Sequence, residues 1–92
     1  MLDIGAGVGA LVVTVPDDMC GRELEISPHG RPRPREHTVA RRRQVPNGPV
    51  VAAVFPAVAA GDHDLWAPDG SWLGSARVSA GQVTEVAFGQ GG

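Results

Sequence analysis

Three histidines and two aspartates are the side chains of this chain that are best suited to chemistry. Asp62, His63 and Asp64 follow one another, whereas His29 and His37 lie in the first half of the chain. Imidazole nitrogens and carboxylate oxygens are common metal ligands, but the spacing matches no tight motif such as H-x-H or H-E-x-x-H. On a strand, Asp62 and Asp64 would share a face from which His63 points away. His29, His37 and His63 are therefore candidate metal ligands, and the alternative is that they are surface histidines beside an acidic strand edge.

A second candidate site is basic. Six of the eight arginines fall within thirteen residues, and they are Arg31, Arg33, Arg35, Arg41, Arg42 and Arg43. Their planar guanidinium groups suit phosphate or carboxylate partners. The segment contains no aromatic group that would stack on a base, and strand alternation separates Arg42 from its two neighbours, so nucleic acid is disfavoured. We expect a solvated loop and exposed strand, with contact to an acidic protein partner or another chain as the functional alternative.

The N-terminal residues 2–9, LDIGAGVG, resemble motif I of Rossmann-type methyltransferases, in which glycines let a strand-to-helix turn approach the cofactor. That motif requires a following helix, whereas the next residues, ALVVTVP, are β-branched and end at a proline. We therefore expect a turn that leads into a first strand, and no cofactor.

Nucleophilic catalysis has no support from sequence motifs. The chain has no G-x-S-x-G motif, and its single cysteine, Cys20, fits an inert small residue better than half of a thiolate–histidine pair. The sequence therefore leans towards a protein that is not an enzyme.

Short strands must position these side chains. Apolar or alternating runs are separated by turn signals every eight to twelve residues, which is typical of an all-β sandwich or small barrel. The expected strands cover residues 10–15, 23–27, 37–45, 50–55, 62–66, 71–78 and 83–88. Leu24 and Ile26 should face inward, and a short helical turn is expected over residues 17–20. The run Pro46-Asn47-Gly48-Pro49 predicts a hairpin, with positive φ angles at Asn47 and Gly48.

Trp66 and Trp72 lie on adjacent expected strands across a turn. Because the chain has only two other aromatic residues, we expect both tryptophans to fill the core. The alternative is an exposed platform for a sugar or a partner.

The last third of the chain contains two turn motifs that support a family resemblance. The first motif is matched by Val58, Ala60, Gly61 and Leu65, and the second by Val78, Gly81, Gln82, Val83 and Val86. This segment resembles the carboxypeptidase-regulatory-like, or prealbumin-like, β-sandwich domains, although Ala59 replaces a usual proline and His63 a usual aromatic residue. The resemblance implies a structural, adhesive or carbohydrate-contacting module. The whole chain resembles small uncharacterised actinobacterial proteins.

Length and composition set limits on these interpretations. Ninety-two residues suit one small domain, and the net charge of −2 gives no general attraction to nucleic acid or anionic membrane. One cysteine cannot form an internal disulfide. No signal peptide and no apolar run of about 20 residues are visible, so we expect no membrane span and a cytoplasmic location.

Together these features predict a single antiparallel β-sandwich of about seven strands, prealbumin-like or immunoglobulin-like. Its domain should cover residues 10–88, after a glycine-rich segment 1–9 and before a flexible tail 89–92. The leading functional hypothesis is a non-enzymatic binding or accessory module that contacts a protein partner, or a second copy, through the arginine-rich segment or an edge strand. The alternative is a small metal-binding protein or enzyme that uses His29, His37 and His63.

Overall fold

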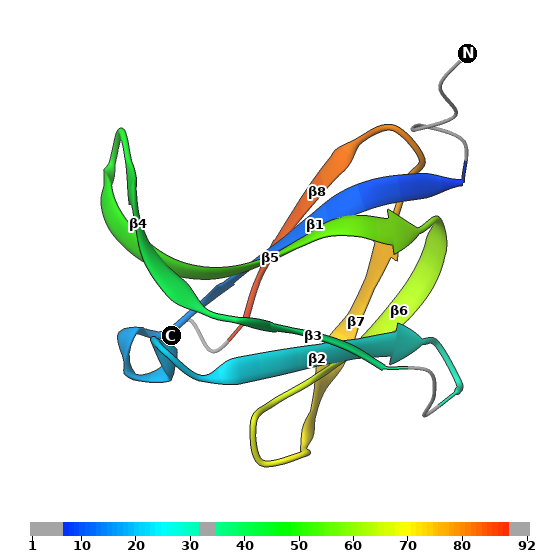
Figure 1. Ribbon diagram of the computed structural model, residues 1–92, viewed down its shortest axis with the longest axis horizontal. Helices are drawn as coiled ribbons and strands as arrows, with labels where there is room; N and C mark the ends of the chain where they lie inside the picture. The colour runs from blue at the N-terminus through cyan, green and yellow to red at the C-terminus, as the bar shows by residue number, and fades with distance from the viewer. Residues whose placement is uncertain (1–6, 32–34, 89–92) are drawn as a thin grey trace.

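The structure is a computed structural model in which residues 7–31 and 35–88 are described. Nearly all of its regular structure is β-strand (Figure 1). The elements are β1 (Val8–Val15), the short 3-10 helix η1 (Asp17–Met19), β2 (Glu23–Pro28), β3 (Glu36–Val39), β4 (Arg41–Val45), β5 (Gly48–Ala59), β6 (Gly61–Trp66), β7 (Trp72–Val78) and β8 (Val83–Ala87). The predicted helical turn is confirmed as η1. The predicted flexible tail 89–92, and residues 1–6 of the predicted glycine-rich segment, lie outside the described residues.

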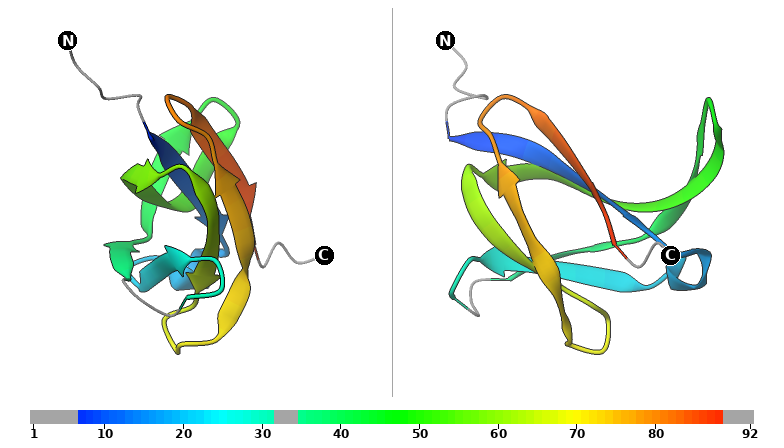
Figure 2. Two further views of the ribbon diagram at one scale, coloured as in Figure 1. Left: turned by 90° about the vertical axis from the view of Figure 1, so that its right-hand side faces the viewer. Right: turned by 180° about the vertical axis from the view of Figure 1, so that it is seen from behind.

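Two four-stranded sheets form a β-sandwich, which confirms the predicted fold class. The strand order is β4-β5-β1-β8 in one sheet, called sheet A, and β3-β2-β6-β7 in the other, called sheet B. All pairs are antiparallel except β1 and β8, which are parallel because the chain crosses from sheet B to sheet A between β7 and β8. In Figures 1 and 2 the β4–β5 hairpin projects beyond sheet B.

The single strand expected over residues 37–45 is divided into two. β3 pairs with β2 in sheet B, whereas β4 pairs with β5 in sheet A. The change of sheet occurs at Ala40, which is completely buried and whose backbone N–H donates to the Arg22 carbonyl at 2.9 Å. The Gly21 N–H donates to the Ala40 carbonyl at 2.8 Å. This small side chain lets the backbone pass between the two sheets, and the strand count becomes eight.

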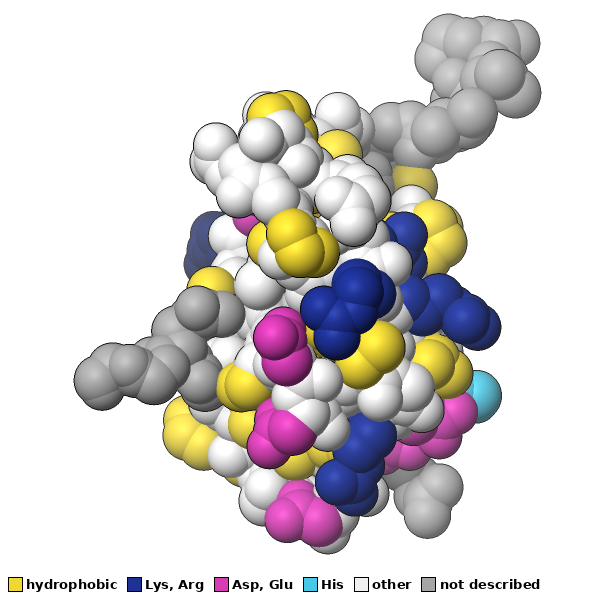
Figure 3. Space-filling view, turned by 90° about the vertical axis from the view of Figure 1, so that its left-hand side faces the viewer, with side chains coloured by type: hydrophobic (Ala, Val, Ile, Leu, Met, Phe, Trp, Pro, Cys, Tyr) yellow, Lys and Arg dark blue, Asp and Glu magenta, His cyan; other side chains and the backbone are white. Residues whose placement is uncertain are grey.

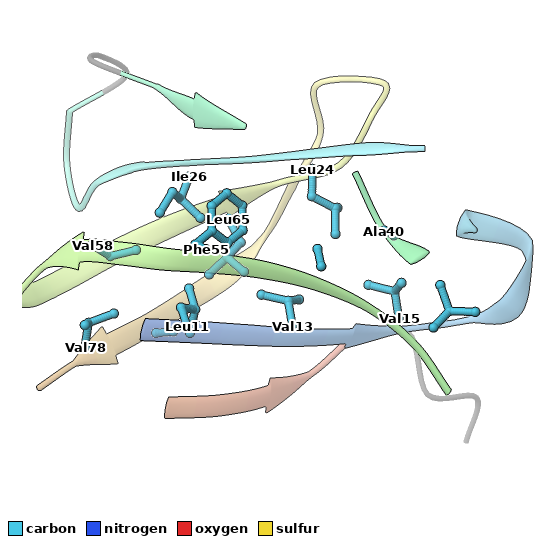
Figure 4. Packing of buried hydrophobic residues seen from close by; sticks show 13 residues of the cluster. Leu11, Val13, Val15, Leu24, Ile26, Ala40, Phe55, Val58, Leu65 and Val78 are labelled. Atoms are coloured by element: carbon cyan, nitrogen blue, oxygen red, sulfur yellow. The ribbon is translucent and has the colours of Figure 1, made fainter. Parts of the chain in front are cut away.

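The core lies between the two sheets. Burial alternates along β1, so that Leu11, Val13 and Val15 face inward. Leu24 and Ile26 meet them from β2, as the alternation of β2 predicted (Figure 4). Phe55 is the only aromatic side chain among the buried residues of the described chain.

Both tryptophans lie outside this core, so the prediction that they pack inside it is wrong. Leu65 is paired with Gly74, and Trp66 with Trp72, which leaves Leu73 as the extra residue of a β-bulge. The extra residue reverses the alternation of β7, so that Leu73 packs against the core while Trp72 is 58% exposed.

Candidate functional site

Three of the predicted site residues lie on β4. Arg41, Arg42 and Arg43 occupy an edge strand of sheet A, and all five residues of β4 are exposed. The register pairs Arg41 with Ala52, Arg42 with Val51 and Arg43 with Val50. Arg41 and Arg43 therefore lie on the outer face of sheet A, and Arg42 lies on the opposite face, as strand alternation predicted.

The backbone of β4 presents hydrogen-bonding groups at this edge. Val45 and Gly48 close the hairpin around the two-residue turn Pro46-Asn47. Alternation in an antiparallel pair then directs the N–H and C=O groups of Arg42 and Gln44 away from β5. Pro49, which has no N–H, is the partner of Gln44, so it sits at a position where no ladder donor is required. Of the two positive φ angles predicted for this turn, only Gly48 has one, at +117°.

The other arginines of the predicted site lie elsewhere. The Arg35 guanidinium donates from Nη1 to Glu25 Oε1 at 2.8 Å and lies 4.2 Å from the centre of the Trp66 ring, on sheet B. Arg31 is exposed just after β2, and Arg33 lies outside the described residues. The structure thus separates Arg35 from the β4 arginines, because β3 and β4 belong to different sheets. Figure 3 shows basic side chains on the hairpin side interspersed with hydrophobic and acidic ones.

A polar network that sequence reasoning missed lies on the outer face of sheet B, centred on Asp64. Asp64 as a whole residue is only 7% exposed. His29 Nδ1 lies 2.9 Å from Asp64 Oδ1, the Gly30 N–H donates to Oδ2 at 3.1 Å, and Trp72 Nε1 donates to Oδ1 at 3.2 Å. These contacts fasten the segment after β2 to β6.

Electrostatics within this network favour the charged forms. The hydrogen bond to His29, aided by those from Gly30 and Trp72, holds the pKa of the Asp64 carboxyl below its ordinary value of 3.8, against the opposing effect of burial. The same hydrogen bond and the charge of Asp64 raise the pKa of His29 above 6.5. The arrangement is a charge-assisted hydrogen bond between segments 35 residues apart.

Trp66 lies on the same outer face of sheet B as Asp64. Its Nε1 donates to Ser27 Oγ at 2.9 Å, and Ser27 is almost completely buried. The alternation of Asp62, Asp64 and Trp66 was visible in the sequence. The bulge at Leu73 and the approach of His29 and Gly30 left no local signal, so the network could not be assembled from sequence.

The three candidate metal-binding histidines have three different partners. His29 contacts Asp64, and His37 Nδ1 lies 2.8 Å from Glu23 Oε2. His63 Nε2 lies 2.6 Å from the Ala59 carbonyl oxygen, to which it donates. His63 is only 6% exposed. The prediction that all three histidines lie at the surface is therefore wrong for His63. Within residues 7–31 and 35–88, no group of three or more His, Cys, Asp or Glu side chains is placed to hold a metal ion.

The glycine at position 9 has a structural role. Its neighbours are the carbonyl oxygens of Ser79 and Gln82, and a Cβ at this position would lie 2.8 Å from the latter. Hydrogen bonds from Ala10 N–H to the Gln82 carbonyl and from Gly81 N–H to the Val8 carbonyl fix the β7–β8 turn over β1. Gly9 lies within β1, and the strand continues to Val15 where a cofactor motif would require a helix.

Comparison of the chain with protein-family models, curated proteins and solved structures found no match. Among the described residues, no helix is long and apolar enough to cross a membrane.

Proposed function

We propose that the protein is a non-enzymatic binding module that takes an extended acidic segment of a partner protein as an additional strand beside β4. The observation that carries this proposal is the position of β4 at the edge of sheet A, with all five residues exposed and three arginines in succession.

The backbone supports strand addition at this edge. An extended peptide beside β4 would pair with the outward N–H and C=O groups of Arg42 and Gln44. Among the described strands, β4 pairs with β5 on one side only, and the β4–β5 hairpin projects beyond sheet B (Figure 1).

The side chains favour carboxylates in the partner. In the described part of the chain, Arg41, Arg42 and Arg43 form no ion pair. They are directed to both faces of sheet A, so acidic side chains at successive positions of an added strand would each find a guanidinium group nearby. The three successive arginines make β4 locally basic, although the chain as a whole has a net charge of −2.

The test measures binding of a fluorescent, glutamate-rich strand-forming peptide by anisotropy, against the same peptide with lysine in place of glutamate. The acidic peptide should bind, and its affinity should fall as salt is added. Each exposed charge pair contributes about 0.2–1 kcal/mol, so the triple variant R41S/R42S/R43S should bind the acidic peptide about 3- to 150-fold more weakly.

Replacement of Gln44 separates backbone pairing from charge. Gln44→Pro removes an N–H that faces the free edge and leaves the β4–β5 ladder intact, whereas Gln44→Ala retains that N–H. Strand addition predicts that the proline variant loses binding and the alanine variant keeps it. Equal binding by both would show that the arginines act as a simple charged surface. Failure of the acidic peptide to bind at all would mean that the arginines only protect the edge from pairing.

A further inference from the structure

The outer face of sheet B carries two tryptophans that are fixed in the same way. Trp66 donates its Nε1–H from β6 to Ser27 of β2 at 2.9 Å. Trp72 donates its Nε1–H from β7 to Asp64 of β6 at 3.2 Å. Both indoles therefore lean across the sheet in the same direction, and each is held by a hydrogen bond to a buried residue. They differ in cover, because Trp66 is half-buried whereas Trp72 is 58% exposed.

The Trp66 ring shows what covers an indole on this face. The Arg35 guanidinium lies 4.2 Å from the centre of the ring, and its Nη1 donates to Glu25 Oε1 at 2.8 Å. Glu25 is the register partner of Trp66 on β2, so the carboxylate that holds the guanidinium lies level with the ring. A guanidinium is planar and weakly hydrated, and the negative face of an indole attracts it. The chain thus already caps one of its two tryptophans with an arginine.

No cation caps Trp72 within residues 7–31 and 35–88. Its Nε1–H is bonded to Asp64, so the part of the side chain that remains for a ligand is the face of the ring. This ring has a fixed orientation while more than half of the residue is in water. It therefore offers stacking area for a flat group at a small further cost in conformational entropy.

The carboxylates close to Trp72 favour a cation as that flat group. Asp64 is bonded to the indole itself, although it shares its charge with an imidazole. Asp69 lies in the turn before Trp72, and its Oδ1 accepts hydrogen bonds from the Ser71 N–H at 2.9 Å and from Ser71 Oγ at 2.7 Å. These bonds hold the pKa of the Asp69 carboxyl below its ordinary value of 3.8. Arg22 adds a small effect in the same direction, but no ion pair to Asp69 forms among the described residues.

We propose that the exposed ring of Trp72 receives an arginine side chain of a partner protein, which would lie over the indole as Arg35 lies over Trp66. A free guanidinium compound fits less well, because small-molecule sites enclose most of their ligand and Trp72 lies open on an edge strand. Lysine also fits less well, because its ammonium group is not planar and holds its water more strongly. The surface is on the opposite sheet from β4, so this inference does not rest on the proposed function.

The test follows the ring protons of both tryptophans by NMR while a capped Gly-Arg-Gly peptide is added. The control peptide carries citrulline, a neutral isostere of arginine, at the same position. The arginine peptide should shift the Trp72 resonances and leave those of Trp66 unchanged, and the citrulline peptide should shift neither. Asp69→Asn should weaken binding about 1.4- to 5-fold, the range expected for one exposed charge pair. Glu85→Gln, which removes a carboxylate from sheet A, should leave binding unchanged.

Arg35→Ala tests the comparison between the two rings, because it uncovers Trp66 beside the Glu25 carboxylate. In this variant the arginine peptide should shift the resonances of both tryptophans. Circular dichroism checks that the variant keeps its fold. Failure of the uncovered Trp66 to respond would contradict the comparison from which the proposal is drawn.

The Trp72 resonances decide the remaining outcomes. No shift with the arginine peptide, or equal shifts with the citrulline peptide, would overturn the proposal. Shifts that grow with protein concentration alone and vanish in R41S/R42S/R43S would mean that a second copy supplies the arginine, which would overturn the assignment to another protein. That triple variant should otherwise bind the arginine peptide as the wild type does, so this test and the test of the β4 edge can fail independently.

Discussion

The carboxylate of Asp64 joins three parts of the chain: β6, the segment after β2, and the start of β7. A charge this deeply placed is stable only when donors surround it, and here an imidazole, a backbone N–H and an indole N–H do so. From sequence, the alternation of residues 62–66 placed Asp64 on the same face as Asp62 and away from His63, but the expectation that Trp66 fills the core left the outward direction of that face unpredicted. The identity of its donors depends on pairing between β2 and β6, which no local pattern encodes.

The first prediction concerns pH and the His29–Asp64 pair. His29 has a raised pKa in the folded chain, so its contribution to the free energy of unfolding is complete below pH 6.5 and is lost as pH rises through the raised value. Asp64 has a lowered pKa, so its contribution is complete above pH 3.8 and is lost as pH falls through the lowered value. We expect His29→Ala to destabilise the protein most between pH 3.8 and 6.5, as measured by urea unfolding.

An NMR titration of His29 checks the cause. The wild-type ring should titrate above pH 6.5, and Asp64→Asn should return its midpoint towards 6.5. Asp69→Asn removes a different carboxylate, which is bonded to Ser71, and should leave the midpoint where it was. A wild-type His29 that titrates at 6.5 would show that the contact with Asp64 does not persist in solution.

At the scale of elements, the strands with clear alternation were predictable and the departures from alternation were not. Leu24 and Ile26 face inward as expected because β2 is a regular strand. The bulge at Leu73 reverses the alternation of β7, which exposes Trp72. Ala40 divides one expected strand between two sheets, although its neighbours carry no glycine or proline to mark the change. Both departures depend on which strands pair, so local propensity gave no warning of them.

The second prediction concerns Gly9, where β1 lies directly beneath the β7–β8 turn. A Cβ at this position would press on the backbone carbonyls of Ser79 and Gln82, which cannot rotate away as a flexible side chain would. We expect Gly9→Ala to cost about 1–3 kcal/mol of unfolding free energy, as other overpacked sites do. Thermal and urea unfolding measure the change.

Ala57→Ser is the control for Gly9→Ala. Ala57 is exposed on β5 beside the same end of β1, so the added hydroxyl should change stability by about 0.5 kcal/mol at most. If Gly9→Ala were as mild as this control, the turn over β1 would have to be freely displaceable. The hydrogen bonds that join Val8 and Ala10 to Gly81 and Gln82 would then contribute little.

At the scale of the whole molecule, the fold class followed from the number and spacing of the strands, but the distribution of the candidate site residues over the two sheets did not. The basic run looked continuous in sequence, and the structure divides it between Arg35 on sheet B and the arginines of β4 on sheet A. The parallel pairing of β1 with β8 joins residues from opposite ends of the chain. Such pairing is set by closure of the whole sandwich rather than by local sequence.

The last prediction concerns the small core that this closure encloses. A domain of this size has an unfolding free energy of about 5–15 kcal/mol. Phe55 is 2% exposed and is the largest side chain among the buried residues described; around it lie mainly valine, leucine and alanine. Phe55→Ala should cost about 3–5 kcal/mol, because small neighbours on a β-sheet cannot collapse into the space left by the ring. That loss is a large share of the total, so we expect a marked fall in the urea midpoint and a detectable unfolded population without denaturant.

Val45→Ala, at a position 40% exposed on the projecting hairpin, should change the midpoint little. Equal effects of the two substitutions would contradict a core organised around Phe55, and would mean that the two sheets are held together chiefly by their connecting turns.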